Sequence, residues 1–326
     1  MAEITLVEAI NLALARAMTE DETVLVLGED VGLNGGVFRA TQGLFQKFGP
    51  DRVRDTPISE GMIAGLSVGL AAQGFRPVGE IQFMGFIYPA IDQLVSHASR
   101  MRNRTRGRLT CPIVIRAPYG GGIRAPEHHS ESMEALFAHA PGMRVVIPSS
   151  PASAYGLMLG AIRNPDPVVF LEPKRIYRAI KEDVADTGEA LELDKCRVLR
   201  MGADVTIATW GAMVVETLEA ARLLSAENIS AEVIDVSTLK PLDAATILQS
   251  VEKTGRCIIV HEAPLTGGFG AEVSARIAEF GLTSLLAPIR RITGYDTIMP
   301  LYKSEHYYMP KTSRIVAAAR EAMEFA

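Results

Sequence analysis

Two carboxylates and a histidine stand out as side chains that could carry acid–base chemistry. Glu29 follows a short apolar run, Glu60 opens an almost uncharged helical run, and His129 precedes a predicted helix. Gln82 and Phe86 lie in a segment that also follows an apolar run. Carboxylates and a histidine beside apolar rings can have pKa values that are pushed apart, as general acid–base catalysis requires. For Glu60 taken alone, a structural residue at a helix N-terminus is the simpler interpretation.

Metal-dependent and nucleophilic chemistries lack the residues that they need. His128 and His129 are adjacent, so their side chains diverge, and Glu127 and Glu131 lack the helical spacing of a zinc-protease motif. No Gly-x-Ser-x-Gly turn occurs in the chain, and Cys111 has no neighbours that would stabilise a thiolate. Acid–base chemistry is therefore what remains.

The glycine-rich segments 119–122 and 267–270 match neither the Rossmann nor the P-loop spacing. Three consecutive glycines after a predicted strand still mean that the backbone turns tightly there or approaches something closely. A site built from the residues named above has no phosphate anchor and no metal ligand of its own. If it is catalytic, it is half of an active site.

The elements that carry these residues predict a doubly wound, mostly parallel sheet. Strands are expected at 23–27, 76–83, 111–116, 143–147 and 168–171, alternating with helices at 6–17, 41–48, 60–73, 86–101, 133–138 and 152–162. Each strand is a continuous apolar run, which is typical of strands covered on both faces. Ligands of such sheets lie outside the carboxyl ends of the strands, where the candidate residues also fall. The helix at 60–73 is apolar all round and is expected to be buried, with Ser59 as its N-cap.

A second α/β unit is expected after a charged, aperiodic stretch at 172–200, which we interpret as an extended linker. Strands are predicted at 204–209, 231–235, 257–261 and 290–292, and helices at 213–224, 243–251, 271–280 and 311–323. This unit has few clustered acids along the sequence, which favours a role in packing, oligomerisation or partner binding.

Composition and charge exclude several classes of protein. The chain has 326 residues, of which 48% are hydrophobic and 22% charged, and a net charge of -5. This balance argues against nucleic acid or an anionic membrane as the main partner, and a basic cluster at 100–108 favours a solvated helix end or a subunit contact. Three scattered cysteines predict neither a disulfide framework nor a zinc site. No apolar run is long enough to cross a bilayer and no signal peptide is recognisable, so we expect a cytoplasmic protein.

Seven segments of the chain resemble, in order and spacing, the beta subunit of the thiamine-diphosphate-dependent decarboxylase component of 2-oxo acid dehydrogenase complexes. These segments are 28–32, 55–60, 80–83, 128–132, 166–175, 253–256 and 291–297. The resemblance implies a transketolase-like pyrimidine-binding domain (1–175), a linker (176–200) and a transketolase C-terminal domain (201–326). It also implies an alpha/beta heterotetramer that binds thiamine diphosphate between unlike chains. The chain lacks the Gly-Asp-Gly element of single-chain relatives, which fits an alpha subunit that supplies the magnesium and diphosphate site.

The resemblance assigns roles to the candidate residues. Glu60 matches the glutamate that hydrogen-bonds the aminopyrimidine ring of the cofactor and promotes its imino tautomer. Glu29 matches a second acid close to Glu60, and two neighbouring carboxylates would raise the pKa of one of them. Gln82 and Phe86 match contacts of the pyrimidine, and Ile58 would pack against the face of the ring.

Two further assignments follow from the same resemblance. His129, rather than its neighbour, matches the active-site histidine that would act on the lipoyl or substrate side. Family members also hold a potassium ion with backbone carbonyl groups, for which the matching positions are Ile113, Ala161, Asn164 and Asp166.

The leading hypothesis is therefore an enzyme subunit. With its alpha partner it would decarboxylate a 2-oxo acid oxidatively and acylate the lipoyl group of an acyltransferase, whose subunit-binding domain would dock on the C-terminal domain. A non-catalytic scaffold subunit and a homomeric transketolase-type enzyme remain as alternatives. The segments 128–132 and 174–178 mildly favour a branched-chain 2-oxo acid over pyruvate as the substrate.

Overall fold

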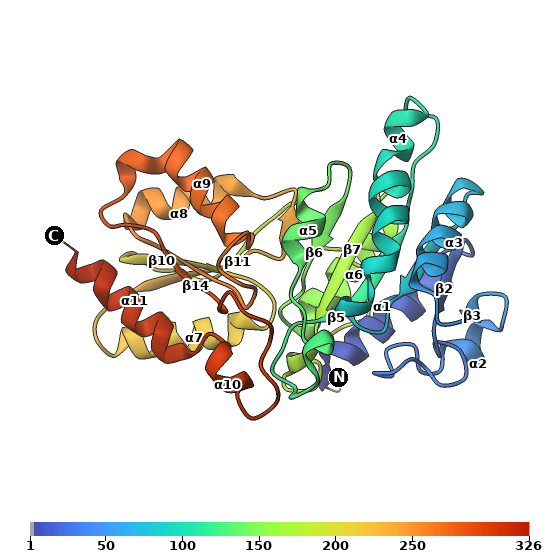
Figure 1. Ribbon diagram of the computed structural model, residues 1–326, viewed down its shortest axis with the longest axis horizontal. Coiled ribbons are helices and arrows are strands. Elements are labelled where there is room, and N and C mark those ends of the chain that lie inside the picture. The colour runs from blue at the N-terminus through green and yellow to red at the C-terminus, as the bar shows by residue number, and fades with distance from the viewer. Residues whose placement is uncertain (1–2, 326) are drawn as a thin grey trace. The chain divides into compact units, whose positions relative to one another are not determined.

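The computed structural model describes residues 3–325, which form two compact α/β units (Figure 1). The first unit contains the chain up to Tyr119 together with Leu136–Leu193, and the second contains Gly120–Ala135 together with the chain from Asp194 onward. The sequence gives no sign that residues 120–135 belong with the second unit. Within the described residues, no helix is both long and apolar enough to cross a membrane.

The first unit is built on a parallel sheet, as predicted. The strands that the first unit contributes lie in the order β6-β7-β5-β4-β2-β3, and each neighbouring pair among them is parallel. They are β2 (Val24–Gly28), β3 (Val53–Asp55), β4 (Arg76–Glu80), β5 (Val114–Tyr119), β6 (Arg144–Val146) and β7 (Val168–Pro173). Every residue of β2, β5 and β7 is buried, which explains why β2 is a continuous apolar run and why β5 and β7 are apolar apart from Arg116 and Glu172.

Four helices of this unit lie close to their predicted ranges: α1 (Leu6–Glu20), α2 (Leu44–Phe48), α3 (Glu60–Ala72) and α6 (Pro151–Arg163). Of these, α1 packs against α6. The capping box at Thr5 is present, because its side chain accepts from the Glu8 amide and the Glu8 carboxylate accepts from the Thr5 amide. The α5 helix (Glu134–His139) spans the boundary between the two units along the chain.

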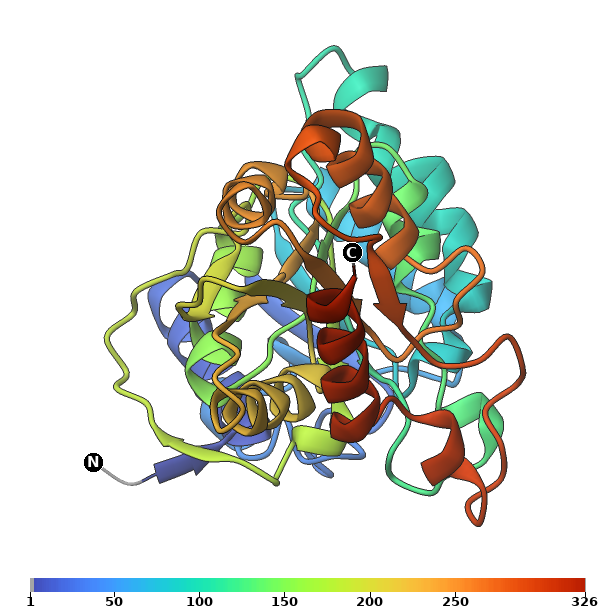
Figure 2. The same cartoon turned by 90° about the vertical axis from the view of Figure 1, so that its left-hand side faces the viewer.

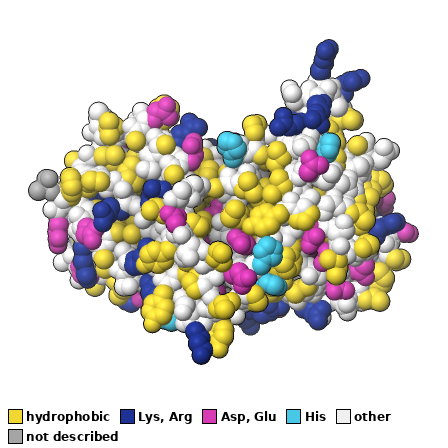
Figure 3. Space-filling view, in the orientation of Figure 1, with side chains coloured by type: hydrophobic (Ala, Val, Ile, Leu, Met, Phe, Trp, Pro, Cys, Tyr) yellow, Lys and Arg dark blue, Asp and Glu magenta, His cyan; other side chains and the backbone are white. Residues whose placement is uncertain are grey.

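The helix expected at 86–101 is instead a series of short helical pieces that runs beside α3 (Figures 1 and 2). The pieces are η1 (Met84–Phe86), η2 (Tyr88–Ala90), the π-helical η3 (Asp92–His97), η4 (Ala98–Arg100) and α4 (Met101–Arg104). Pro89 lies within η2 and has no amide hydrogen, so a regular helix cannot continue through it. The basic cluster at 100–108 is exposed, and Figure 3 shows Lys and Arg side chains gathered at the tip that α4 forms in Figure 1.

The expectation that α3 is buried all round is wrong for this chain. Ile63 and Ala64 are fully buried, because this face packs against β4 and η2, whereas Met62 and Leu66 on the other face are 39% and 42% exposed. The helix forms an outer layer of the unit, so a uniformly apolar sequence leaves one apolar face uncovered. Ser59 is at the N-cap, as predicted, but its side chain makes no capping hydrogen bond.

The linker expected at 172–200 is more ordered than predicted. β8 (Lys181–Asp183) pairs antiparallel with β1 (Glu3–Thr5), and β9 (Arg197–Arg200) joins the sheet of the second unit. Both segments are charged edge strands that pair through backbone groups, so they lack the apolar pattern that identifies a buried strand.

The second unit has a mostly parallel sheet in the order β14-β13-β10-β11-β9; of the described strands in this sheet, only β9 pairs antiparallel with its neighbour. Its other strands are β10 (Val205–Thr209), β11 (Ala231–Asp235), β13 (Cys257–Val260) and β14 (Arg290–Ile292), and β12 (Thr238–Lys240) follows β11 in the chain. Helices α8 (Ala244–Thr254) and α9 (Gly270–Gly281) cover one face, and α7 (Met213–Ser225) and α11 (Thr312–Glu324) cover the other (Figure 1). Asp243 caps α8 through the Thr246 amide, as predicted.

Candidate active site

The sheet of the first unit changes its winding direction between β2 and β4. The chain leaves β2 toward β3 on one side, whereas it leaves β4 toward β5 on the other. Ligands of doubly wound sheets bind at such a switch point, outside the carboxyl ends of the strands. The register sets Gly28 beside both Asp55 and Glu80, so the residues that follow all three strands emerge at one edge. Glu29 and Gln82 therefore flank the switch point.

Glu29 lies close to Glu60 and has a perturbed pKa. Its side chain is 5% exposed, whereas Glu60, the first residue of α3, is half-buried. Burial raises the pKa of Glu29, and the charges of Glu60 and Asp30 raise it further, against a hydrogen bond from the Ser59 amide. The Glu29 Oε1 atom is buried with no hydrogen-bond partner among the described residues. Glu29 thus holds its proton more readily than an exposed glutamate, and it offers one unused polar atom to a bound group.

Two other candidate residues, Gln82 and Phe86, lie in a segment that carries contacting aromatic rings. Phe83 makes edge-to-face contacts with Phe38 and Phe86, with ring centroids 5.4 and 5.6 Å apart. Gln82 is half-buried beside them in the chain, and Ile58 is 85% exposed. Together, the exposed isoleucine, the two carboxylates and the ring-lined segment suit a flat heteroaromatic ligand. Such a ligand packs its faces on apolar side chains and forms hydrogen bonds at its rim.

Strands β4, β5 and β7 carry a buried ionic network that we did not predict from the sequence. Arg116 on β5 donates to both carboxylate oxygens of Glu172 at 2.6 and 2.7 Å, and it also donates to Glu80. The Tyr177 hydroxyl donates to Glu172 as well. Burial raises the pKa of Glu80 and that of Tyr177. The available signal was a charged residue inside each of three strands: Glu80 ends β4, Arg116 lies in the middle of β5, and Glu172 is the last residue but one of β7.

His128 and His129 belong to the second unit, on the turn η5 (Glu127–His129). They lie in a loop whose ends meet, because the Gly120 amide donates to the Glu131 carbonyl at 2.8 Å. The glycine run turns as predicted, with φ of +84° at Gly120. His129 is half-buried, whereas His128 is exposed.

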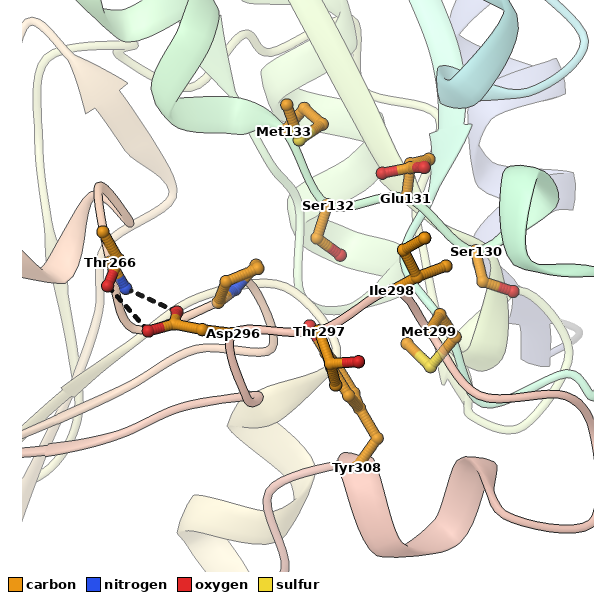
Figure 4. A pocket seen from close by; sticks show the side chains of 11 residues that line it. Ser130, Glu131, Ser132, Met133, Thr266, Asp296, Thr297, Ile298, Met299 and Tyr308 are labelled. Carbon is orange, nitrogen blue, oxygen red and sulfur yellow. Dashed lines mark hydrogen bonds between the residues drawn. The ribbon is translucent and has the colours of Figure 1, made fainter.

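A cavity of about 460 Å³ adjoins the closing end of this loop, within the second unit (Figure 4). Its lining combines hydroxyl, acidic and apolar side chains: Ser130, Glu131, Ser132, Met133, Pro264, Thr266, Asp296, Thr297, Ile298, Met299 and Tyr308. The amide and hydroxyl of Thr266 donate to the Asp296 carboxylate at 2.8 and 2.6 Å, and these bonds lower the pKa of Asp296.

The second unit brings together acidic residues that are far apart along the sequence. Glu134 is fully buried and accepts a hydrogen bond from Trp210 Nε1 at 3.2 Å. Burial raises the pKa of Glu134 to about 7, and the charge of Glu262 adds to the shift. His261 stacks on Trp210 with ring centroids 5.1 Å apart, and burial lowers its pKa to about 4. These residues are far apart in the sequence, so the linear pattern gives no sign of the cluster.

The four positions expected to bind potassium lie in the first unit. The Ile113 and Ala161 carbonyls each accept one backbone hydrogen bond, which leaves a lone pair on each oxygen. The Arg76 guanidinium, however, donates to the Asn164 carbonyl at 3.3 Å, and Asp166 pairs with a neighbouring arginine. A potassium ion on the Asn164 oxygen would be repelled by this like charge. Potassium at this position stays a prediction, and Asn164 fits it poorly.

Two family models cover most of the chain. The Transketolase, pyrimidine binding domain matches residues 2–180, and the Transketolase, C-terminal domain matches residues 194–315. A solved structure described as "Split gene transketolase, inactive beta4 tetramer" is similar with a TM-score of 0.82 and 25% identity, and covers 99% of both chains. The predicted fold class is confirmed: the protein is a two-domain, transketolase-like α/β protein.

Curated relatives define the family more narrowly. The pyruvate dehydrogenase E1 component subunit beta of Acholeplasma laidlawii is 50% identical over 321 residues, with 98% of each chain covered. The subunits of the same name from Bacillus subtilis and Staphylococcus aureus are 49% and 46% identical over 325 residues, with full coverage of both chains. The chain therefore belongs to the family of E1 component beta subunits of 2-oxo acid dehydrogenases, which use thiamine diphosphate.

Proposed function

We propose that this chain, together with an alpha subunit, catalyses the oxidative decarboxylation of pyruvate and the reductive acylation of a lipoyl group on an acyltransferase. The observation that carries the catalytic assignment is the proximity of Glu29 to Glu60 at the switch point of the first sheet. A weakly basic ring nitrogen needs a partner that can share a proton with it, and two neighbouring carboxyl groups provide such a partner.

In this proposal Glu60 shares a proton with a ring nitrogen of the aminopyrimidine, and Glu29, whose pKa is raised, lies beside it as a second acid. Thiamine diphosphate, when bound, supplies the nucleophilic carbon and the electron sink of the reaction. Gln82 hydrogen-bonds the rim of the pyrimidine, and Ile58 and Phe86 pack against it. The unpartnered Oε1 of Glu29 and the 85% exposure of Ile58 support such a ligand at this edge.

We assign the magnesium and diphosphate site to the alpha subunit, since the chain has no Gly-Asp-Gly element. The exposed apolar side chains Met62 and Leu66 on α3 support a partner that covers this helix in an alpha/beta heterotetramer. His129 acts on the lipoyl or substrate side, and the acyltransferase's subunit-binding domain docks on the C-terminal unit.

Pyruvate is the proposed substrate, because three relatives that match the whole chain have pyruvate in their names. The mild preference for a branched-chain substrate finds no support in them. Co-expression with the alpha subunit, followed by dye-reduction assays, tests the substrate. We expect a higher kcat/KM for pyruvate than for 2-oxobutyrate or 2-oxoisovalerate, whereas a preference for 2-oxoisovalerate would contradict the proposal.

A homomeric transketolase-type enzyme is the second candidate, because the similar solved structure is described as a beta4 tetramer. That tetramer is also described as inactive, which favours the heteromeric proposal. Calorimetric titration of the isolated chain with thiamine diphosphate and magnesium separates the two: tight, magnesium-dependent binding would support the homomeric enzyme.

A further inference from the structure

Two buried carboxylates hold the glycine loop that leads to the histidines, and neither has an assigned role. The Gly121 amide donates to Glu262 Oε2 at 2.9 Å. The Gly122 and Arg124 amides donate to the two oxygens of Glu305 at 2.6 and 2.8 Å. Hydrogen bonds to an ionised carboxylate are shorter and roughly twice as strong as neutral ones.

Both carboxylates are fixed within the second unit. Glu262 follows β13 and is 3% exposed, and Glu305 begins α10 (Glu305–Tyr308) and is 4% exposed. Burial of a carboxylate is costly unless hydrogen bonds compensate it. The loop amides provide this compensation, so the carboxylates and the loop stabilise one another.

The loop backbone is fitted closely to these two side chains. A Cβ atom on Gly120 would lie 2.5 Å from Glu262 Oε1, so only glycine fits without displacement of the carboxylate. Arg124 has a φ of +58°, which is a left-handed conformation that is unfavourable for a non-glycine residue. The bond from its amide to Glu305 offsets this strain.

The histidines depend on this arrangement because they lie between two fixed points. The loop is held at Gly121–Arg124 by the carboxylates, and it is closed at its base by the bond from the Gly120 amide to the Glu131 carbonyl. His128 and His129 lie in the short span between Arg124 and Glu131, with no other regular element than η5.

We propose that Glu262 and Glu305 are positioning residues that hold the histidine loop in the conformation used for acyl transfer to the lipoyl group. This inference rests on the proposed function, since it takes His129 to act in that step. Neither glutamate reacts with the substrate; each acts through the backbone of residues 120–124.

The test uses Glu305→Gln in the complete alpha/beta enzyme, with the exposed Glu279→Gln on α9 as the matched control. Glutamine keeps one acceptor oxygen but loses the charge and the second acceptor, so one of the two loop amides faces an NH₂ donor. Hydrogen–deuterium exchange in peptides covering 120–132 should accelerate about tenfold or more, since tenfold corresponds to one lost bond of about 1.4 kcal/mol. The control should leave this exchange unchanged.

Activity is measured in two assays on the same samples. In Glu305→Gln, the rate of reductive acylation of a lipoyl domain should fall at least about tenfold, whereas the rate of dye-linked decarboxylation should stay within about twofold of normal. When Glu305→Gln is combined with His129→Ala, the acylation rate should be no lower than in His129→Ala alone. Unchanged exchange in 120–132 would overturn the inference, and so would faster exchange with normal acylation. A normal acylation rate in His129→Ala would contradict the proposed role of the histidine, while the exchange data would still test whether Glu305 holds the loop.

Discussion

Glu134 provides a sharp test of the buried acid cluster, because its ionisation must destabilise the fold. Its pKa is raised from 4.5 to about 7, chiefly by burial. The folded state therefore binds the proton more tightly than the unfolded chain does. The stabilisation is complete below pH 4.5 and is lost as the pH rises through 7, and a shift of 2.5 units corresponds to about 3 kcal/mol.

Glu134→Gln removes this pH dependence, since glutamine stays neutral and its oxygen can still accept from Trp210 Nε1. We expect the variant to gain about 2–3 kcal/mol over the natural chain between pH 5 and pH 8. Urea unfolding followed by fluorescence measures this, because Trp210 is the single tryptophan in the chain and contacts Glu134 directly. Glu279→Gln, at an exposed position, is the control. An equal difference in stability at pH 5 and pH 8 would refute the reasoning.

Two further predictions concern other parts of the chain. Arg116→Met should destabilise the first unit by about 3–5 kcal/mol in urea unfolding, because it leaves the Glu80 and Glu172 carboxylates buried without their partner; a loss below 1 kcal/mol would contradict this. Gly120→Ala should cost clearly more stability than Gly49→Ala, because both have a left-handed φ but only Gly120 faces a carboxylate at 2.5 Å. Equal costs would show that the close approach to Glu262 has no consequence.

Much of the fold was accessible from the sequence because it depends on local patterns. Buried parallel strands are continuous apolar runs, and the residues that end them are easily recognised. Glu29 and Gln82 were expected just after strand ends on this basis, and in the structure they follow β2 and β4, whose carboxyl ends lie side by side. Charged edge strands such as β8 and β9 were missed, because their pairing needs only backbone groups.

The site residues that the sequence did not reveal are paired with residues far away in the chain. Arg116 and Glu172 are paired within the sheet although 56 residues separate them, and Gly121 meets Glu262 over a separation of 141 residues. No local periodicity encodes such pairs. The α3 helix shows the opposite limit: its apolar sequence predicts burial correctly for Ile63, but it cannot say whether this chain or another covers the second face.

The proposed role of Glu60 is to activate a cofactor that is shared with another chain. Its most direct test is Glu60→Gln, co-expressed with the alpha subunit and assayed for dye-linked decarboxylation of pyruvate. The amide cannot share a proton as the carboxyl does, so we predict that the variant assembles normally and loses at least about a hundredfold in kcat, the scale of general acid–base catalysis. Near-normal turnover by the assembled variant would contradict the account.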